Sequence, residues 1–466
     1  MAEKVVPVQR LNFKMYPRDR TKTGTYQHSS GSPYIVFQFA QNATRVIDPK
    51  SVYLCGKFRI KHKQNDQCPA NVYDIAGAAS NNIENHEQVA YPNARIGVNS
   101  FIRQVVVGDL QGSAYEFSDS YNRNLASTVA VRNSYKSMCT FGNMSLTACA
   151  NNDVMARESS SSMEFALPLQ NGYYNSNPSL SLERGQEIKF QLESDANVLF
   201  GASSENMKYE LTDVYLAGDF VVMDKPLTGI SVDYVSFFQY NNGLNSGNEH
   251  LNQNLNLSRV NKIFHNFLVD KWQTNPEYDT FCTPPIMDAD KDNVGDYVEA
   301  KIKQYQISRA NISYPDVYMV NEEKANKADG FQTVRSRNFI NSITNYNTNK
   351  SCLISPVTEG LDSMVMPRSD YFRTPQSPDN GFIPRWEKNE ANGQWQRNGK
   401  KESGAMVYGL GCNLDQLNIR AWSSYNDAMY NFAIESELDS EPNKTFIFCS
   451  AETQLKSAGP MIVATN

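Results

Sequence analysis

The sequence has few charged side chains. Asp, Glu, Lys and Arg make up 20% of its 466 residues, below the roughly 25% of an average soluble domain. The formal net charge is −6, which argues against the broad basic surface of a nucleic-acid-binding protein. The polar surface must come largely from Asn, Gln, Ser, Thr and Tyr. Such a surface suits strands, long loops and proteins that bury much of their outside against neighbours.

Several targeting and redox signals are also missing. The eight cysteines form no C-x-x-C pair, which excludes zinc-knuckle and thioredoxin-type motifs. No apolar run approaches the roughly 20 residues that span a bilayer. The opening MAEKVVPVQR lacks the apolar core of a signal peptide. We therefore expect synthesis in a reducing cytoplasm with free thiols, and we expect Cys55 and Cys449 to be buried, because both lie in strand-like runs.

Catalytic motifs are absent as well. The five histidines are far apart and form no H-x-H or H-E-x-x-H pattern, and the sequence has no G-x-S-x-G, P-loop or dinucleotide-binding glycine motif. His265 alternates with Ile263 and Phe267, which is typical of a core histidine. We expect no enzyme.

One acidic segment has the spacing of a calcium loop. Its carboxylates fall on positions 1, 3, 5, 9 and 12 of the EF-hand pattern. Asn293 stands where the pattern has Gly, and two prolines precede the segment where an entering helix would lie. A structural Ca²⁺ is therefore the one cofactor the sequence suggests, and an exposed acidic loop between strands is the alternative. The candidate ligands are Asp288, Asp290, Asp292, Asp296 and Glu299.

The dominant pattern that is present is alternation of apolar and polar residues. Successive side chains of a strand point to opposite faces, so this pattern predicts sheets with one buried face. Helical stretches are few and short, at 118–129 and 414–422, and Asn-Gly and Asp-Gly turn dipeptides are frequent. The sequence predicts an all-β sandwich or barrel with long polar loops at 64–91 and 362–402. The clearest strands fall at 51–62, 162–169, 186–193, 211–223 and 430–438.

An Asn-, Gly- and Ser-rich segment, YNNGLNSGNEHLNQ, lies near the middle of the chain. Each half then has the size of one elaborated β-sandwich. We expect an N-terminal basic segment at 1–25, a first sandwich at 26–240, a linker at 241–253 and a second sandwich at 254–466. The basic segment is interpreted as a solvated tail or, alternatively, as an arm that reaches acidic partners such as packaged nucleic acid or a membrane surface.

Five segments, in order, resemble the double jelly-roll major capsid proteins of double-stranded DNA viruses. VNSFIRQVVVGDLQGSAYEF resembles that family's first strand-turn-strand, and LNLSRVNKIFHNFLVD resembles the start of its second jelly roll. The chain departs from the pattern where Gly108-Asp109 replaces Gly-Gly and where the proline of the last motif is absent. The five segments are 98–117, 163–195, 209–224, 232–240 and 255–270.

The resemblance implies two consecutive jelly-roll sandwiches with long loops and few short helices. It implies a structural protein of the virion, of the virophage or polinton-like virus type, that forms homotrimers. These pseudo-hexameric capsomers would tile an icosahedral shell and contact neighbouring capsomers, penton and minor capsid proteins. The basic segment would face the genome or an inner layer, and no small-molecule substrate is expected.

Two other functions are compatible with a jelly roll, because this fold hosts many activities. A glycan-binding or attachment protein could stack sugars on exposed tryptophans, the candidates being Trp272, Trp386, Trp395 and Trp422. A polysaccharide lyase or hydrolase would need an acid–base pair of side chains, and no such pair stands out in the sequence.

Overall fold

The computed structural model of the chain describes its strands and the connections next to them. The described residues are 5–18, 24–30, 33–66, 91–92, 97–125, 163–176, 180–200, 206–227, 231–244, 247–255, 257, 260–269, 286–287, 297–298, 302–309, 312–320, 385–388, 395–398, 409–413, 429–436, 443–458 and 461–465.

The first sandwich has two facing sheets. One has the order β1-β12-β4-β8, with two short strands, β3 (Asn42–Ile47) and β9 (Ser181–Leu182), added on the β4 side of β12, and the other has the order β2-β10-β6-β7. Neighbouring strands are antiparallel throughout. The eight principal strands are β1 (Pro7–Met15), β2 (Tyr34–Phe39), β4 (Tyr53–His62), β6 (Ile102–Gly108), β7 (Ala114–Ser118), β8 (Met163–Pro168), β10 (Gln186–Leu192) and β12 (Met207–Met223).

The alternation in the sequence becomes alternation of burial. In β10, Ile188, Phe190 and Leu192 are fully buried while the residues between them are half-buried. Because one face of each sheet is apolar, the two sheets close on each other and exclude water from these side chains. The five strands expected from periodicity are confirmed as β4, β8, β10, β12 and a strand of the second sandwich, β23 (Met429–Ser436).

The second sandwich also has two main sheets. Their orders are β13-β24-β15-β22, with β25 (Met461–Thr465) beside β24, and β14-β23-β18-β19. Besides β23, its principal strands are β13 (Ser231–Leu244), β14 (Gly247–Asn254), β15 (Val260–Val269), β18 (Ile302–Arg309), β19 (Ile312–Val320), β22 (Gly409–Asn413) and β24 (Asn443–Ala458).

The two sandwiches have the same topology. If the eight principal strands of each are counted along the chain, one sheet has the order first, eighth, third, sixth, and the other has second, seventh, fourth, fifth. This is the order of a jelly roll, a double-sheet fold with two Greek keys. The expected fold class, two consecutive jelly rolls with few short helices, is therefore confirmed.

The remaining described elements are short. A helical turn at 121–125 follows β7, within the segment expected to be helical at 118–129, whereas 414–422 lies outside the described residues. The other described helical elements are η1 (His28–Ser30), η2 (Pro49–Ser51), η4 (Gly97–Phe101), α5 (Gly172–Ser176) and α6 (Asp195–Val198). Three pairs of short strands are also described: β5 (Tyr91–Pro92) with β11 (Leu199–Phe200), β16 (Ile286–Met287) with β17 (Tyr297–Val298), and β20 (Arg385–Lys388) with β21 (Trp395–Asn398). Within the described part of the chain, no helix is long and apolar enough to cross a membrane.

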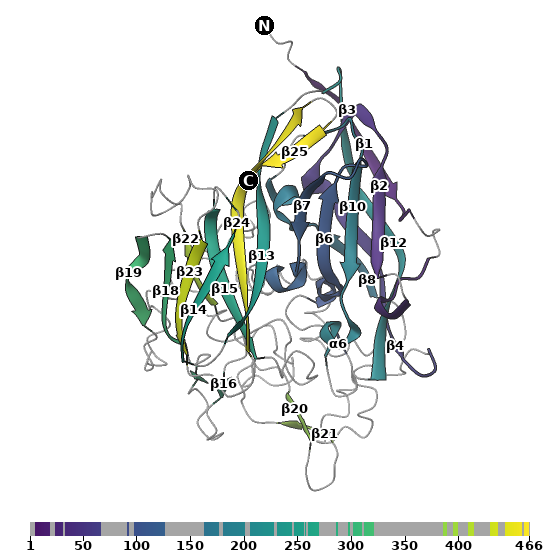
Figure 1. Cartoon of the computed structure of the whole chain (residues 1–466). Coiled ribbons are helices and arrows are strands. Elements are labelled where there is room, and N and C mark those ends of the chain that lie inside the picture. The colour runs from purple at the N-terminus through teal and green to yellow at the C-terminus, as the bar shows by residue number, and fades with distance from the viewer. Residues whose placement is uncertain are drawn as a thin grey trace, which may run out of the picture.

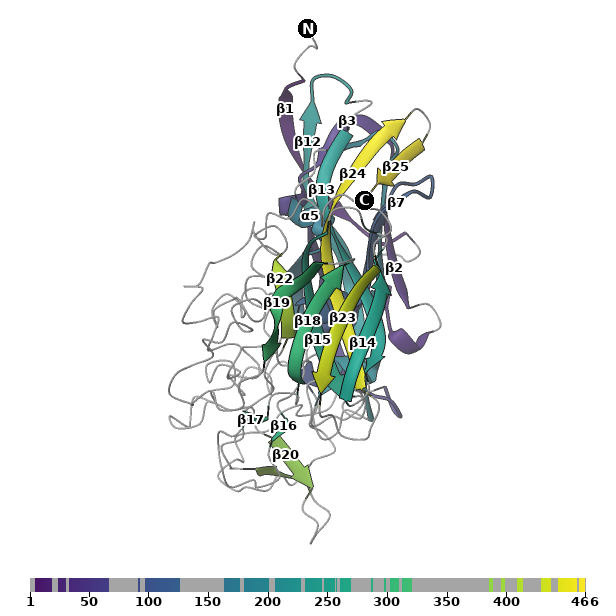
Figure 2. The ribbon, with the colours of Figure 1, turned by 60° about the vertical axis from the view of Figure 1, so that its left-hand side comes forward.

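The sandwiches lie side by side, with the sheet that contains β13 and β24 facing the first sandwich (Figures 1 and 2). Phe264 of β15 and Phe448 of β24 stack with ring centroids 4.8 Å apart and belong to one buried cluster with the core of the first sandwich. The strand β24 is buried on consecutive residues from Ile447 to Ala451, so both of its faces are covered. The apolar core is therefore continuous from one sandwich to the other.

The structure divides the chain earlier than the sequence indicates. Residues 241–253 were expected to be a linker, but residues 241–244 lie in β13 and residues 247–253 lie in β14. Strand β13 pairs along its whole length with β24 of the second sandwich, so the second sandwich begins by Ser231. The expected basic arm at 1–25 contains β1, the first strand of the first sandwich. Both segments are polar in composition, yet each forms a strand because it pairs with the long last strand of a sandwich, β1 with β12 and β13 with β24.

Candidate functional site

A buried carboxylate lies where the two sandwiches meet. Glu116 of β7 is 3% exposed and accepts four hydrogen bonds. Its Oε1 accepts from the backbone N–H of Gly172 at 2.9 Å and of Phe237 at 3.0 Å. Its Oε2 accepts from Tyr173 N at 2.7 Å and Asn171 Nδ2 at 2.6 Å. One carboxylate of the first sandwich thus joins the start of α5 to strand β13 of the second.

The surroundings of Glu116 act on its charge in opposite directions. Burial raises the pKa of Glu116 above its ordinary value, because a charged carboxylate loses its hydration. The hydrogen bonds from Phe237, Tyr173 and Gly172, and the nearby Ser118 hydroxyl, lower that pKa but do not cancel the effect of burial. The carboxylate in turn disfavours ionisation of nearby tyrosines and helps to raise the pKa of Tyr234. The junction is a polar site inside an apolar interface.

The helix α5 rests directly on the backbone of β13. Its Ser176 hydroxyl accepts from the N–H of Val235 at 2.8 Å, and Tyr234 donates its hydroxyl to the carbonyl oxygen of Tyr115. A Cβ atom added at Gly172 would lie 2.0 Å from the carbonyl oxygen of Val235. Glycine is required at position 172 because the two chain segments approach so closely.

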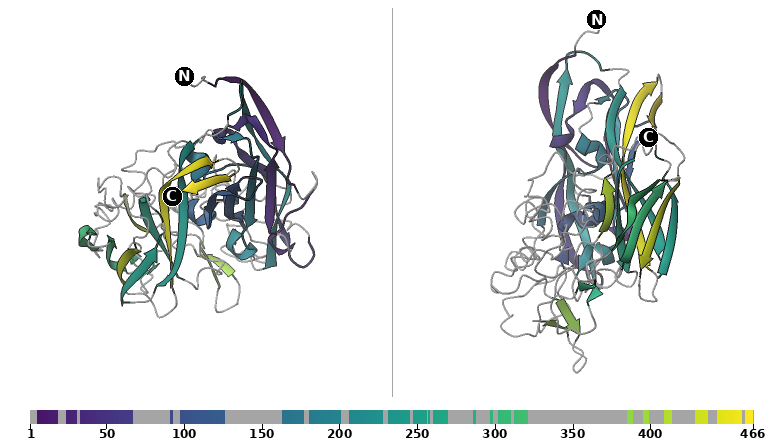
Figure 3. Two further views of the ribbon diagram at one scale, coloured as in Figure 1. Left: turned by 45° about the horizontal axis from the view of Figure 1, so that its top comes forward. Right: turned by 90° about the vertical axis from the view of Figure 1, so that its left-hand side faces the viewer.

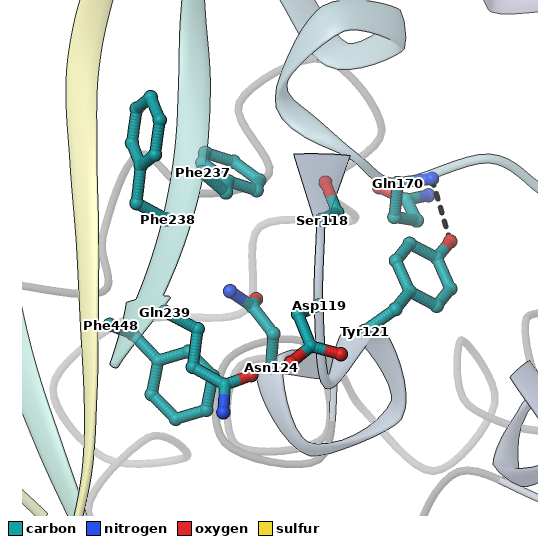
Figure 4. A pocket seen from close by; sticks show the side chains of 9 residues that line it. All are labelled: Ser118, Asp119, Tyr121, Asn124, Gln170, Phe237, Phe238, Gln239 and Phe448. Carbon is teal, nitrogen blue, oxygen red and sulfur yellow. Dashed lines mark hydrogen bonds between the residues drawn. The ribbon is translucent and has the colours of Figure 1, made fainter. Parts of the chain in front are cut away.

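A small cavity lies beside this junction (Figure 4). Its empty volume of about 260 Å³ includes space that is open to solvent. At one side of the cavity, the hydroxyl of Tyr121 accepts a 2.8 Å hydrogen bond from the backbone N–H of Gln170 (Figure 4). Both sandwiches contribute to its wall: Ser118, Asp119, Tyr121, Asn124 and Gln170 from the first, and Phe237, Phe238, Gln239 and Phe448 from the second.

The position where the chain departs from the capsid-protein pattern has a defined role. Asp109 Oδ1 accepts from the backbone N–H of Gln111 at 2.9 Å and of Ser113 at 2.8 Å, which closes the β6–β7 turn. Its Oδ2 accepts from Arg184 Nε at 2.7 Å. Burial alone would raise the pKa of Asp109, but these hydrogen bonds outweigh it and hold the pKa below its ordinary value. Asp109 therefore fixes the turn that precedes Glu116.

The five candidate calcium ligands, Asp288, Asp290, Asp292, Asp296 and Glu299, lie outside the described residues. The structure shows that β16 and β17 pair antiparallel on either side of residues 288–296, with Ile286 opposite Val298. Among the residues that the structure describes, no group of three or more His, Cys, Asp or Glu side chains is placed to hold a metal. The calcium site remains a prediction.

Other expectations fall inside the described strands. His265 is fully buried in β15, with its ring centroid 4.4 Å from that of Phe432, as expected for a core histidine. Cys55 and Cys449 are buried, as expected. Trp386 lies in β20 and Trp395 in β21, whereas Trp272 and Trp422 lie outside the described residues. The sandwich wall therefore contains its expected buried residues, and the glycan-binding alternative stays untested.

Sequence analysis did not single out Glu116 or α5. A signal was present in the apolar run Phe446–Cys449 of β24, because a strand that is apolar at consecutive positions is typically covered on both faces. That run indicates a second packing partner for the sheet. The sequence does not say which residues form that partner.

Comparison with known proteins finds similarity in solved structures. No family model matches the chain, and no curated protein sequence matches it. The cryo-EM structure of the Sputnik virophage is 10% identical with a TM-score of 0.48, covering 100% of this chain and 89% of that chain. The mavirus major capsid protein is 9% identical with a TM-score of 0.47, covering 100% and 93%. The Faustovirus major capsid protein is 8% identical with a TM-score of 0.48, covering 98% and 92%.

Proposed function

We propose that this chain is a structural capsid protein that assembles with copies of itself and has no catalytic role. The observation that carries the proposal is the duplicated jelly roll, in which both halves have the same strand order and share one core. Viral capsid domains are among the proteins built on this fold. The order of the five family-like sequence segments favours a capsid protein over the other functions that jelly rolls host.

The topology gives the molecule two different ends. The strands of each sandwich alternate in direction, so the connections that follow the third and fifth principal strands leave from one end, and the chain enters the first strand from the other. In the first sandwich these connections are 63–101 and 119–162, and in the second they are 270–301 and 321–408. The hairpin β20–β21 lies at the end opposite the N-terminus (Figure 3). We assign the end with the long connections to the outside of the shell and the end with the N-terminus to its inside.

The finer proposal is a homotrimer that acts as a pseudo-hexameric capsomer. Three chains with two similar jelly rolls each present six similar modules around one axis, a shape that can fill a six-fold position in an icosahedral lattice. Such a capsomer would contact neighbouring capsomers, penton and minor capsid proteins in the virion. Burial of apolar and aromatic surface between subunits would stabilise it, at roughly 25 cal/mol per Å² before the entropy cost of association.

The test is the assembly state of the purified full chain. Sedimentation velocity at micromolar concentration should show a species of three chains, and negative-stain images should show pseudo-hexagonal particles or shells. A single monomeric species over the whole micromolar range would contradict the proposal. A monomer that binds a glycan array without forming particles would favour the attachment-protein alternative.

A further inference from the structure

Strand β13 lies at the edge of its sheet. In the described part of the chain it pairs with β24 on one side and with no strand on the other. An edge strand presents unpaired N–H and C=O groups, and such groups are a template for pairing with another chain. What covers this edge therefore decides whether a second copy can add a strand to it.

Two side chains of the first sandwich occupy this edge. The N–H of Val235 donates to Ser176 Oγ at 2.8 Å, and the N–H of Phe237, two residues along, donates to Glu116 Oε1 at 3.0 Å. Alternate residues of a strand direct their N–H groups to the same side. These two bonds thus take the positions that a neighbouring strand would use.

The geometry at Glu116 suits this role. Its two oxygens receive four N–H donors, and an ionised carboxylate offers about four acceptor positions. Three of those donors belong to Asn171, Gly172 and Tyr173 at the start of α5. These three hydrogen bonds orient the carboxylate independently of its contact with β13. Ser176 is the last residue of the same helix. One capping group, Ser176, thus belongs to α5, and the other, Glu116, is held in place by hydrogen bonds from the start of that helix.

We propose that Glu116 and Ser176 substitute for a missing strand at the edge of β13. They are positioning residues that hold the second sandwich on the first and prevent strand addition by a second copy of the chain. The inference concerns the interior of one chain and does not depend on the proposed capsid role.

The experiment measures hydrogen exchange at single amides of the purified full chain. In the wild type, the amides of Val235 and Phe237 should exchange slowly, as amides within a paired ladder do. In Ser176→Ala, exchange should rise about tenfold at Val235 and stay unchanged at Phe237, because one hydrogen bond is removed. In Glu116→Met, it should rise at Phe237, Gly172 and Tyr173. Fast exchange of Val235 and Phe237 in the wild type, or no change in Ser176→Ala, would overturn the proposal.

The matched control is Ser113→Ala in the β6–β7 turn, which should leave both amides unchanged. Size distributions of the same samples test the second part of the proposal. Ser176→Ala should form higher oligomers that increase with concentration beyond those of the wild type and of Ser113→Ala. If the amides exchange faster but the size distribution is unchanged, the edge does not need its cap to exclude a second copy. If Glu116→Met does not fold, the comparison of Ser176→Ala with its control still decides the matter.

Discussion

The ion pair between Asp109 and Arg184 lies almost entirely out of water. The Asp109 side chain is 0% exposed and the Arg184 side chain 10%. In Arg184→Met the carboxylate keeps two backbone donors but loses its cation. We expect this variant to lower the free energy of unfolding by about 3–5 kcal/mol, the usual cost of breaking a buried pair from one side. Chemical denaturation at pH 7 measures the difference.

A matched control lies on the surface of the same sandwich. Arg10 pairs with Asp48 at 3.0 Å and with Asp219 at 3.7 Å, but its side chain is 66% exposed. Arg10→Met should therefore cost less than about 1 kcal/mol. Equal losses in the two variants would show that burial does not decide the strength of the Asp109–Arg184 pair.

His265 gives the second sandwich a dependence on acid. Burial lowers its pKa from 6.5 to about 3, so the unfolded chain binds a proton more tightly than the folded chain does. The stability contributed by the neutral ring is fully present above pH 6.5 and is lost as the pH falls from 6.5 towards 3. The loss is about 1.4 kcal/mol for each pH unit in that window.

The variant His265→Leu isolates this contribution. Denaturation curves at pH 6.5 and 4.5 should show a smaller acid-induced loss of stability in His265→Leu than in the wild type, by about 2–3 kcal/mol. His250→Gln, at an exposed histidine of β14, should follow the wild type. Glu116 acts in the opposite direction: because burial raises its pKa, acidification from that raised pKa down to the ordinary carboxyl pKa adds stability, and further acidification adds none. Parallel curves for the wild type and His265→Leu would refute the assignment.

At the scale of elements, the contact between α5 and β13 depends on one missing side chain. The Cβ of Gly172→Ala would have to displace the backbone at Val235 or the carboxylate of Glu116. We expect a loss of about 2–3 kcal/mol, which is the cost of overpacking a tight site, visible as a lower unfolding midpoint. Gly243 also lies in β13, but a Cβ atom added there meets open space, so Gly243→Ala should change the midpoint little. A tolerated Gly172→Ala would mean that the two sandwiches separate easily.

The individual strands could be predicted from the sequence, because each depends on alternation within a dozen residues. The junction could not. Glu116 meets Gly172 across 56 residues of sequence and Phe237 across 121, and no local pattern encodes such a contact. The predicted linker at 241–253 was wrong for a related reason. The segment Asn241–Leu244 has the composition of a turn, yet it pairs residue by residue with residues 443–446 of β24, which the local sequence does not show.

At the scale of the molecule, the duplication is visible in topology and not in residues. The eighth principal strand is long in both sandwiches and extends past the end of the third principal strand, its neighbour. In both sandwiches a short extra strand pairs with this extension: β3 with β12, and β25 with β24. Equivalent strands of the two sandwiches form the same backbone hydrogen-bond pairing, but their side chains pack against different neighbours. Two sequences can therefore share this architecture without repeating residues, because a core constrains mainly the hydrophobic pattern and the total side-chain volume.

The shared core predicts that the whole chain unfolds as one unit. Phe264, Phe448 and Leu455 of the second sandwich pack in the same buried cluster as the first, so unfolding either sandwich exposes apolar surface of the other. Calorimetry should show one transition whose calorimetric and van't Hoff enthalpies agree, provided the association state is held constant. In Gly172→Ala, where we expect the added Cβ to push α5 and β13 apart, the transition should broaden or split into two. Two separate transitions in the wild type would show instead that the sandwiches are energetically independent, and that the junction at Glu116 orients them without coupling their stability.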